Sequence, residues 1–466
     1  MCLMVARMVK RTVTRRRFIS ATGATTVIGL AGCLGGNGGD GGSGDGGDGG
    51  DGGSGTTTSG STTSSSGGSG GGTIRYLTDR GDSKKIMDKI IAEFEGQSDY
   101  TVEATYTAHG NSTDQQMQKM IAAGHPPDII FVPSSDAYRY KSQGKAASVT
   151  SAVKDNSLPD PVNVDGESYF APAVVEPLMG WYRNDVYDSD PTTWNGWLDE
   201  AKRVSENTNM EGYVVQSGQT NNAETQMFQY LWNDGVNAYS GTPGDIKVEV
   251  DKGDNRQKAI ESFQWIQEMA QYSPNGSGWE WGDAIGALQQ ENAAAIASVG
   301  GLPILSIGSN RPDLVDKLSP MAFPYPSGKS MDPWWAYMEG LVVRNDGDAT
   351  DGAREFVDFF TKSSHFMDFV LAAPLFQFPP RKEQMNTDTF KNNETLNNHP
   401  DVVKLVEDNW DAFSTVLATG DGGAPNIVAA NAYDQQVFGQ AADQMLVGGK
   451  SPTETVDWLG QKLRSL

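Results

Sequence analysis

The residue types that catalysis most often uses are scarce in this chain. Among its 466 residues there are only two cysteines, Cys2 and Cys33, and both precede the part of the sequence that can fold into a core. The four histidines are scattered, with no HExxH motif and no pair four residues apart. The folded part therefore has no cysteine nucleophile, no disulfide and no histidine or cysteine metal site to offer. We expect neither a metal nor a cofactor.

Carboxylates and aromatic rings, which bind polar solutes, are by contrast abundant. The chain has 59 acidic residues and eleven tryptophans. Planar polar groups bind hydroxyls and aromatic rings stack on C–H faces, so a site that combines the two suits a sugar. The aromatic candidates for such a site are Trp232, Trp281, Trp334, Trp335 and Tyr337. Any one of these rings can equally belong to the hydrophobic core.

The hydrophobic pattern after Gly72 predicts alternating strands and helices. Strands are expected at 73–77, 101–106 and 128–132, with helices over about 83–94 and 113–124 between them. This order predicts an α/β fold with a mostly parallel sheet flanked by helices. Such sheets bind ligands at the carboxyl ends of their strands. We therefore expect a site at the loops after Leu77, Tyr106 and Val132.

Polar residues follow two of these strands directly. Asp79 and Arg80 come after the first strand, and Ser134 and Ser135 come after the third. Their position makes them candidates for ligand binding. A solvated turn is the alternative for Asp79 and Arg80, and capping of the next helix is the alternative for the two serines.

Six segments, in this order, resemble the extracellular solute-binding proteins of ABC transporters, in particular the sugar-binding group that includes maltose-binding protein. They are IMDKIIAEFEGQSDYTVEATY, MQKMIAAGHPPDIIFV, YFAPAVVEPLMGWYRNDVY, FQYLWNDGVNAYS, LQQENAAAIASVGG and WWAYMEGLVVRNDGDATDGAREFVDFF. The resemblance covers nearly all of residues 73–381. It implies a two-lobed periplasmic-binding-protein-like fold, each lobe a mostly parallel sheet flanked by helices, with a hinge between the lobes and a ligand bound between them.

Sequence position and breaks at proline and glycine predict where such a hinge lies, although these prolines can equally be ordinary loop residues. The chain is expected to cross between the lobes near Glu176 and Pro177, near residues 323–326, and near Ala373 and Pro374. Residues 73–176 and 325–373 then form lobe 1, and residues 177–324 and 374–466 form lobe 2. Glu176 matches an acidic residue that the maltose-binding group uses at the first crossing, and this makes it a candidate for ligand binding. The alternative is that its carboxylate bonds to the backbone of the hinge.

Two positions depart from the maltose-binding pattern. After Gly300 and Gly301, where that group carries a stacking tryptophan, this chain has Leu302. Another aromatic position of the group is occupied here by Val132. These differences put maltose itself in doubt and leave the expected receptor role unchanged.

The segment that precedes Thr73 indicates export and anchoring. Residues 14–19, TRRRFI, resemble a twin-arginine export motif, and residues 30–33, LAGC, resemble a lipobox. The apolar stretch between them is too short to span a membrane. We expect cleavage of residues 1–33 before Cys33, lipidation of Cys33, and a flexible linker over the Gly/Ser/Thr/Asp-rich residues 34–72. The protein is then held at the extracellular face of the cell membrane.

The net charge narrows the range of partners. The segment from Met1 to Cys33 contains six basic side chains and no acidic ones, so the rest of the chain carries 30 basic against 59 acidic side chains. Such a body repels nucleic acid and anionic lipid, and we expect no nucleic-acid partner. An excess of acid with few lysines is typical of proteins that stay soluble in very high salt, so we interpret the chain as halophilic.

Together these features predict a lipid-anchored, monomeric receptor of an ABC importer. It would capture a sugar or sugar-like polyol between its lobes, deliver it to permease subunits in the membrane and catalyse no reaction. A receptor of the same class for a peptide or an anion is the first alternative. A secreted glycoside hydrolase, which needs two opposed carboxylates, is the second.

Overall fold

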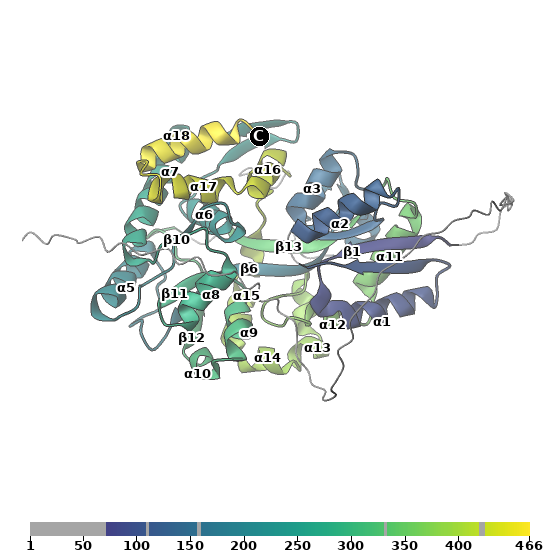
Figure 1. The fold of residues 1–466 in the computed structure, drawn as a ribbon, viewed down its shortest axis with the longest axis horizontal. Coiled ribbons are helices and arrows are strands. Elements are labelled where there is room, and N and C mark those ends of the chain that lie inside the picture. Colours follow the sequence, from purple (N-terminus) through teal and green to yellow (C-terminus); the bar gives the residue numbers. More distant parts are fainter. Residues whose placement is uncertain (1–70, 109–110, 156–159, 330–332, 419–424) are drawn as a thin grey trace, which may run out of the picture. The chain divides into compact units, whose positions relative to one another are not determined.

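The computed structural model describes residues 71–108, 111–155, 160–329, 333–418 and 425–466 (Figure 1). The predicted signal segment, the lipidated Cys33 and almost all of the predicted linker lie outside these residues. The element order begins with β1 (Thr73–Thr78), α1 (Lys84–Glu95), β2 (Thr101–Tyr106), α2 (Asn111–Ala122) and β3 (Ile129–Pro133). Strand β1 pairs in parallel with both β2 and β3. The predicted βαβαβ unit and the α/β class are confirmed.

The amphipathic pattern of α1 explains how this unit packs. Met87, Ile90, Ile91 and Phe94 are buried on one face of the helix, while the lysines of the same helix are exposed. The ring of Phe94 meets Phe356 of α11 (Thr350–Lys362) edge-on at 5.2 Å. Helices therefore cover the sheet at β1 and β3, which are inner strands of the sheet order.

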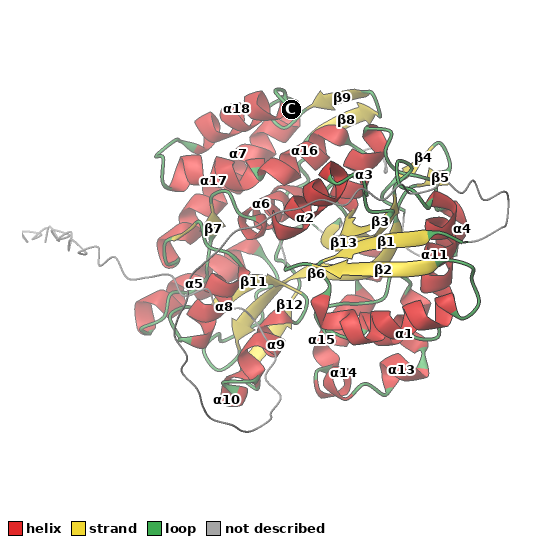
Figure 2. Cartoon of the chain, turned by 45° about the vertical axis from the view of Figure 1, so that its right-hand side comes forward, coloured by secondary structure: helices red, strands yellow, loops and turns green. Residues whose placement is uncertain are grey.

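Two long antiparallel strands, β6 (Ala171–Arg183) and β13 (Trp334–Val343), extend the sheet away from β3 (Figure 2). The order along the sheet is β11-β6-β13-β3-β1-β2, where β11 is Ala295–Val299, and β12 (Leu318–Met321) also pairs with β6. All thirteen residues of β6 are buried. Strand β13 pairs with β3, and β6 pairs with β11 and β12, so the β6–β13 pair connects the two ends of the sheet.

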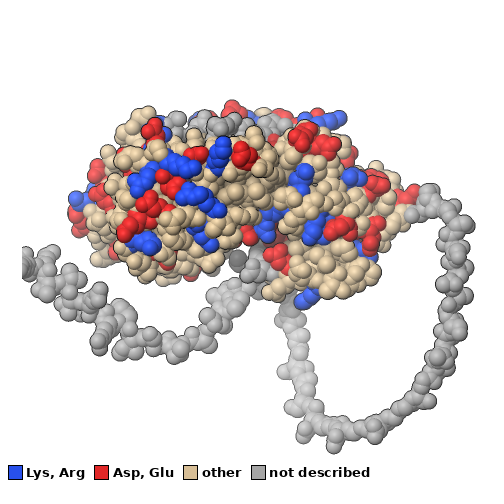
Figure 3. Space-filling view, turned by 90° about the horizontal axis from the view of Figure 1, so that it is seen from above, with Lys and Arg blue, Asp and Glu red and all other residues tan. Residues whose placement is uncertain are grey.

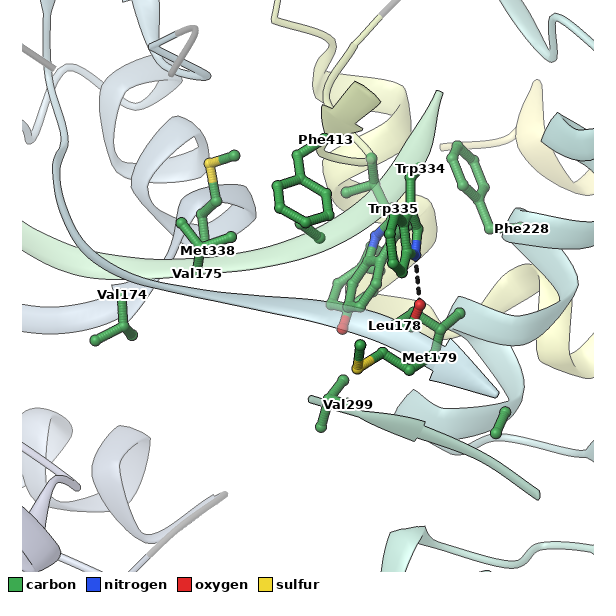
Figure 4. Packing of buried hydrophobic residues seen from close by; sticks show 14 of the residues in the cluster. Val174, Val175, Leu178, Met179, Phe228, Val299, Trp334, Trp335, Met338 and Phe413 are labelled. Atoms are coloured by element: carbon green, nitrogen blue, oxygen red, sulfur yellow. Dashed lines mark hydrogen bonds between the residues drawn. The ribbon is translucent and has the colours of Figure 1, made fainter. Parts of the chain in front are cut away.

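The contacts of these strands form a hydrophobic cluster in the middle of the molecule. Trp334 donates its indole N–H to the carbonyl oxygen of Leu178 in β6, and its ring contacts Phe413 (Figure 4). The main-chain N–H of Trp335 donates to the side-chain oxygen of Gln229 at 2.6 Å. Both tryptophans are almost fully buried, and they fix β13 where it passes β6.

Two of the remaining helices, those of residues 134–142 and 150–153, lie beside the β1–β3 unit (Figure 2). The others lie around the β6, β11 and β12 end of the sheet or along the chain that follows β13 (Figure 1). The remaining helices include α3 (Ser134–Ser142), α4 (Thr150–Val153), α5 (Trp194–Asn207), α6 (Asn221–Asn233), α7 (Gly253–Met269), α8 (Trp281–Gln289), α9 (Leu302–Gly308), α10 (Pro312–Val315), α12 (Phe366–Val370), α13 (Asp388–Lys391), α14 (Glu394–Asn398) and α15 (Pro400–Asp408). The short strands are β4 (Asn163–Val164), β5 (Glu167–Ser168), β7 (Gln216–Ser217), β8 (Tyr239–Thr242), β9 (Asp245–Val248), β10 (Gly276–Ser277) and β14 (Phe413–Ser414).

The chain ends in three helices, α16 (Ile427–Gln435), α17 (Val437–Leu446) and α18 (Pro452–Leu463). Helix α17 packs on α6, and α18 packs on α7 and α17. Helix α16 turns away from them at Gln436, which adopts the left-handed conformation with φ of 56°, and packs on α3. One segment of the C-terminal part therefore reaches back to the helix that follows β3.

The three expected hinge positions lie at different kinds of site. Glu176 and Pro177 are inside β6, paired with Tyr337 and Ala336 of β13. The segment 323–326 packs on the α5 and α6 region, where Asn233 donates to the carbonyls of residues 323 and 324. The segment after Ala373 passes the β11 end of the sheet, where Gly301 donates to the carbonyl of Leu375. The lobe boundaries stay a prediction.

Candidate functional site

A cavity of about 350 Å³ opens at the carboxyl ends of β1 and β3. This volume is within the range of small-molecule binding sites. Its wall combines the loops after β1 and β3 with the start of α2, the middle of β13, the start of α6 and the end of α16. Among the lining residues are Asp79, Thr113, Asp114, Pro133, Ser135, Asp136, Asn221, Tyr337, Glu339, Tyr433, Asp434 and Gln436. The cavity thus lies at the strand ends to which the predicted strand order points.

The wall is dominated by carboxylates. Five acidic side chains contribute to it: Asp79, Asp114, Asp136, Glu339 and Asp434. They come from separate segments of the chain, and the described lining residues include no lysine or arginine. Carboxylates accept hydrogen bonds only, so this arrangement suits a molecule with several O–H or N–H donors.

A buried charge cluster supports the wall from behind. Arg80 is 3 % exposed, and its guanidinium lies 2.9 Å from Glu339, 3.1 Å from Asp82 and 3.6 Å from Glu176. It also lies over the Phe131 ring at 5.7 Å. One buried cation thereby holds three carboxylates, and of these Glu339 faces the cavity.

Burial changes the protonation of this cluster. Burial first, and then the neighbouring charge of Glu339, raise the pKa of Glu176 to about 8 against the opposing effect of Arg80. The amide of Gln377 donates to Glu176 at 3.0 Å. Carboxylates surround Arg80, and their attraction outweighs its burial and raises its pKa above the ordinary value. Glu176 therefore favours its neutral form more than an ordinary carboxyl group does, while Arg80 stays charged.

Aromatic rings form another part of the wall. Tyr337 and Tyr433 line the cavity, with ring centroids 6.2 Å apart. Behind them Trp335 stacks on Tyr433 at 6.4 Å and 23°, and contacts Tyr337 at 5.7 Å. Burial raises the pKa of both tyrosines well above the ordinary value, so they remain neutral hydrogen-bonding groups. The cavity therefore offers ring faces as well as carboxylates.

Two of the carboxylates meet where α3 contacts α16. The guanidinium of Arg139 is 3.0 Å from Asp136 of its own helix and 2.6 Å from Asp434 of α16. Burial and the nearby charges of Asp434 and Asp114 raise the pKa of Asp136 to about 6 against the attraction of Arg139. A second cavity of about 290 Å³ between α2 and α3 shares Asp114 and Asp136 with the first.

The structure brings some of the predicted residues to the cavity and places others elsewhere. Asp79, Ser135 and Tyr337 line it. Arg80, Glu176 and Trp335 lie directly behind the lining residues as described above, and Trp334 is in the central hydrophobic cluster. Ser134 is buried as the first residue of α3, whose N-cap is Pro133, so the alternative of a capping serine is wrong. Trp232 packs on Phe228 within α6, and Trp281 begins α8. Whether each of these residues binds a ligand stays a prediction.

Several lining residues were not foreseen from the sequence. Asp114 and Asp136 stand in the first turns of α2 and α3, where the predicted strand order could have pointed to them. Glu339 lies on β13, two residues after the predicted Tyr337. Tyr433 and Asp434 could not be predicted as site residues, because nothing in the sequence of α16 indicates that this helix packs on α3.

The comparisons with known proteins agree with this fold. Residues 79–364 match the family model of bacterial extracellular solute-binding proteins, and the chain belongs to this family. The match spans over half of the chain and includes all of β6 and β13. The resemblance inferred from the six segments is thereby confirmed. A search among curated protein sequences found no match.

Solved structures of similar fold cover 84–85 % of this chain. The GacH receptor of Streptomyces glaucescens, solved unliganded and with acarbose, is 17 % identical, with a TM-score of 0.64 over 98 % of its length. Maltose-bound MalE3 of T. maritima is 17 % identical, with a TM-score of 0.66 over 99 %. A sugar transporter from Arthrobacter chlorophenolicus with bound laminaribiose is 16 % identical, with a TM-score of 0.68 over 99 %. These matches confirm the two-lobed, periplasmic-binding-protein-like architecture.

The residues that the structure describes include no group of three or more histidine, cysteine, aspartate or glutamate side chains placed to hold a metal ion. None of the helices within them is both long and apolar enough to cross a membrane.

Proposed function

We propose that this protein is the solute receptor of an ABC importer and that its solute is a sugar or a sugar-like polyol. The observation that carries the proposal is the cavity itself, in which five carboxylates and two tyrosines converge at the strand ends of a solute-binding-protein fold. Carboxylates accept from hydroxyls, and the tyrosine rings can stack on the C–H face of a pyranose. Acarbose, maltose and laminaribiose, bound by proteins of similar fold, belong to the same chemical class.

Capture proceeds by closure around the solute. The cavity wall comes from the β1–β3 unit on one side and from α6 and α16 on the other, and β6 and β13 connect these parts. A solute that contacts both sides at once favours the closed arrangement over the open one. The receptor then delivers the solute to permease subunits, and a single copy of the chain suffices for this cycle.

The chemistry of the wall bears on the alternative functions. An anionic solute would face five carboxylates and no lining cation among the described residues, so the wall disfavours it. A peptide with a free amino group remains compatible with the charge. A glycoside hydrolase would use two of the carboxylates as acid and base. The family consists of binding proteins, and we propose that this chain too leaves its solute unchanged.

The proposed location rests on the segment that precedes the folded part. We propose that residues 1–33 direct export through the twin-arginine route, that Cys33 carries a lipid anchor, and that residues 34–72 tether the folded part outside the membrane. Figure 3 shows Asp and Glu interspersed with Lys and Arg on one face of the folded part. The overall acidic excess supports a protein that works in high salt.

Thermal unfolding in high salt against neutral sugars, polyols, peptides and anions tests the proposal. A solute that binds only the folded protein raises the melting temperature, and the shift grows with its concentration. A shift with a neutral sugar or polyol that is recovered unchanged supports the receptor. A shift only with peptides or anions would reassign the solute, and consumption of a sugar would favour the hydrolase.

A further inference from the structure

Arg139 lies outside the site predicted from the sequence. It does not line the main cavity, yet it binds two side chains that do. Its guanidinium contacts Asp136, three residues earlier in α3, and Asp434 at the end of α16. Building on the proposed function, we propose that Arg139 is a positioning residue that couples the seating of α16 on α3 to the orientation of two solute-facing carboxylates.

The two helices belong to different parts of the chain. Helix α3 follows β3 directly, so Asp136 is fixed to the β1–β3 unit. Helix α16 continues through Gln436 into α17, which packs on α6. The contact between Arg139 and Asp434 therefore links the two sides of the cavity. This ion pair forms when α16 rests on α3.

Neighbouring contacts make the position of α16 matter for the cavity. Tyr433, the residue that precedes Asp434 in α16, packs on Trp335 and Tyr337 of β13. On the other side, the amide of Gln436 donates to Asn221 of α6 at 2.9 Å. A displacement of α16 would therefore move a ring, a carboxylate and an amide of the wall together.

Electrostatics explains why a cation is needed at this point. Asp136 and Asp434 share one guanidinium, and the charges of Asp434 and Asp114 both raise the pKa of Asp136. Without Arg139 these carboxylates repel each other across the contact between the helices. With it, both carboxylates are held at hydrogen-bonding distance from one guanidinium, 3.0 Å for Asp136 and 2.6 Å for Asp434, while they line the cavity. Arg139 thus orients acceptors before the solute arrives, which lowers the entropy lost on binding.

A matched ion pair elsewhere provides the control. Arg256 of α7 binds Asp457 of α18 at 2.9 Å, and the two side chains are 36 % and 46 % exposed. The corresponding values are 32 % for Arg139 and 51 % for Asp434. The pair between α7 and α18 joins two helices at comparable exposure and has no residue in the cavity.

Hydrogen exchange of the full chain tests the first half of the proposal without any solute. In Arg139→Gln the amides of α16 should exchange about five- to tenfold faster than in wild type, because the helix leaves α3 more often. In Arg256→Gln the exchange of α16 should not change. Equal protection of α16 in wild type and Arg139→Gln would overturn the proposal, whichever solute the protein binds.

Binding of maltose, laminaribiose or ribitol, whichever raises the melting temperature of wild type, tests the second half. Arg139→Gln should raise Kd about tenfold, mainly through faster dissociation, and Arg139→Lys should recover part of the loss. A cycle with Asp434→Asn should show non-additive effects. Unchanged Kd in Arg139→Gln would overturn the coupling. If none of the three binds wild type, the proposed sugar class fails, and hydrogen exchange alone then decides the position of α16.

Discussion

The protonation of Glu176 makes the stability of this protein depend on pH in an unusual direction. An ordinary paired carboxylate has a lowered pKa and stabilises the fold more as the pH rises. Burial instead raises the pKa of Glu176 to about 8. The folded protein therefore binds a proton that the unfolded chain releases near pH 4.5. The contribution of this group is fully present below about pH 4.5 and is lost as the pH rises through about 8.

The replacement Glu176→Gln removes this dependence. Glutamine keeps an oxygen that can accept from Gln377 and has no charge to bury. One pKa unit corresponds to about 1.4 kcal/mol, so the span from 4.5 to about 8 sets an upper limit of about 5 kcal/mol. Glu176 and Glu339 titrate together around Arg80, and we expect less than half of that limit. The variant should be more stable than wild type by about 2 kcal/mol at pH 8.5 and close to wild type at pH 5.

Chemical denaturation at fixed high salt between pH 5 and 9 measures this difference. The comparison of variant with wild type at each pH cancels the titration of all other groups. Glu407→Gln, at an exposed position of α15, is the control and should show no pH-dependent difference. A variant that is destabilised at pH 8.5, or a difference that does not change with pH, would refute the assignment of a buried, protonated Glu176.

Three further predictions concern the cavity and its support. Trp335→Ala should lower the free energy of unfolding by about 3–5 kcal/mol, because the substitution leaves a cavity at a buried position. Equilibrium denaturation measures the difference, and a loss below about 1 kcal/mol would contradict a structural role of Trp335. Asp79→Asn should weaken solute binding about tenfold, since it exchanges an acceptor in the wall for a mixed donor and acceptor. Calorimetric titration would reveal unchanged affinity if the cavity is not the site. Solute affinity should fall below about pH 6 as Asp136 becomes protonated, and Asp136→Asn should make the affinity weak and independent of pH between 5 and 7; a pH dependence that persists in the variant would exclude Asp136 as its source.

The sequence was most informative where structure is local. The period of apolar residues in 83–94 and the alternation in 101–106 predicted α1 and β2 closely, because burial of one face depends on neighbouring positions alone. The strand order then pointed to the loops after β1, β2 and β3, since parallel strands end at the same edge. The cavity opens at the ends of β1 and β3. Asp79 and Ser135 were accessible to prediction for this reason.

The remainder of the site depends on contacts between distant segments. Tyr433 and Asp434 reach the cavity because α16 bends at Gln436 and rests on α3, a helix from the first part of the folded chain. No local pattern encodes that contact. The sequence could not separate the two roles of a tryptophan for a related reason. A ring such as Trp334 serves equally well in a core, and its packing where β13 passes β6 is a contact between distant segments.

Calorimetric titration of the full chain in high salt with laminaribiose, maltose and ribitol, with recovery of each compound afterwards, tests the central claim most directly. The account predicts saturable one-to-one binding of at least one neutral sugar or polyol, clear weakening of that binding in Asp79→Asn, and complete recovery of the compound. Absence of binding to every neutral sugar and polyol, together with binding of a peptide or an anion, would contradict it.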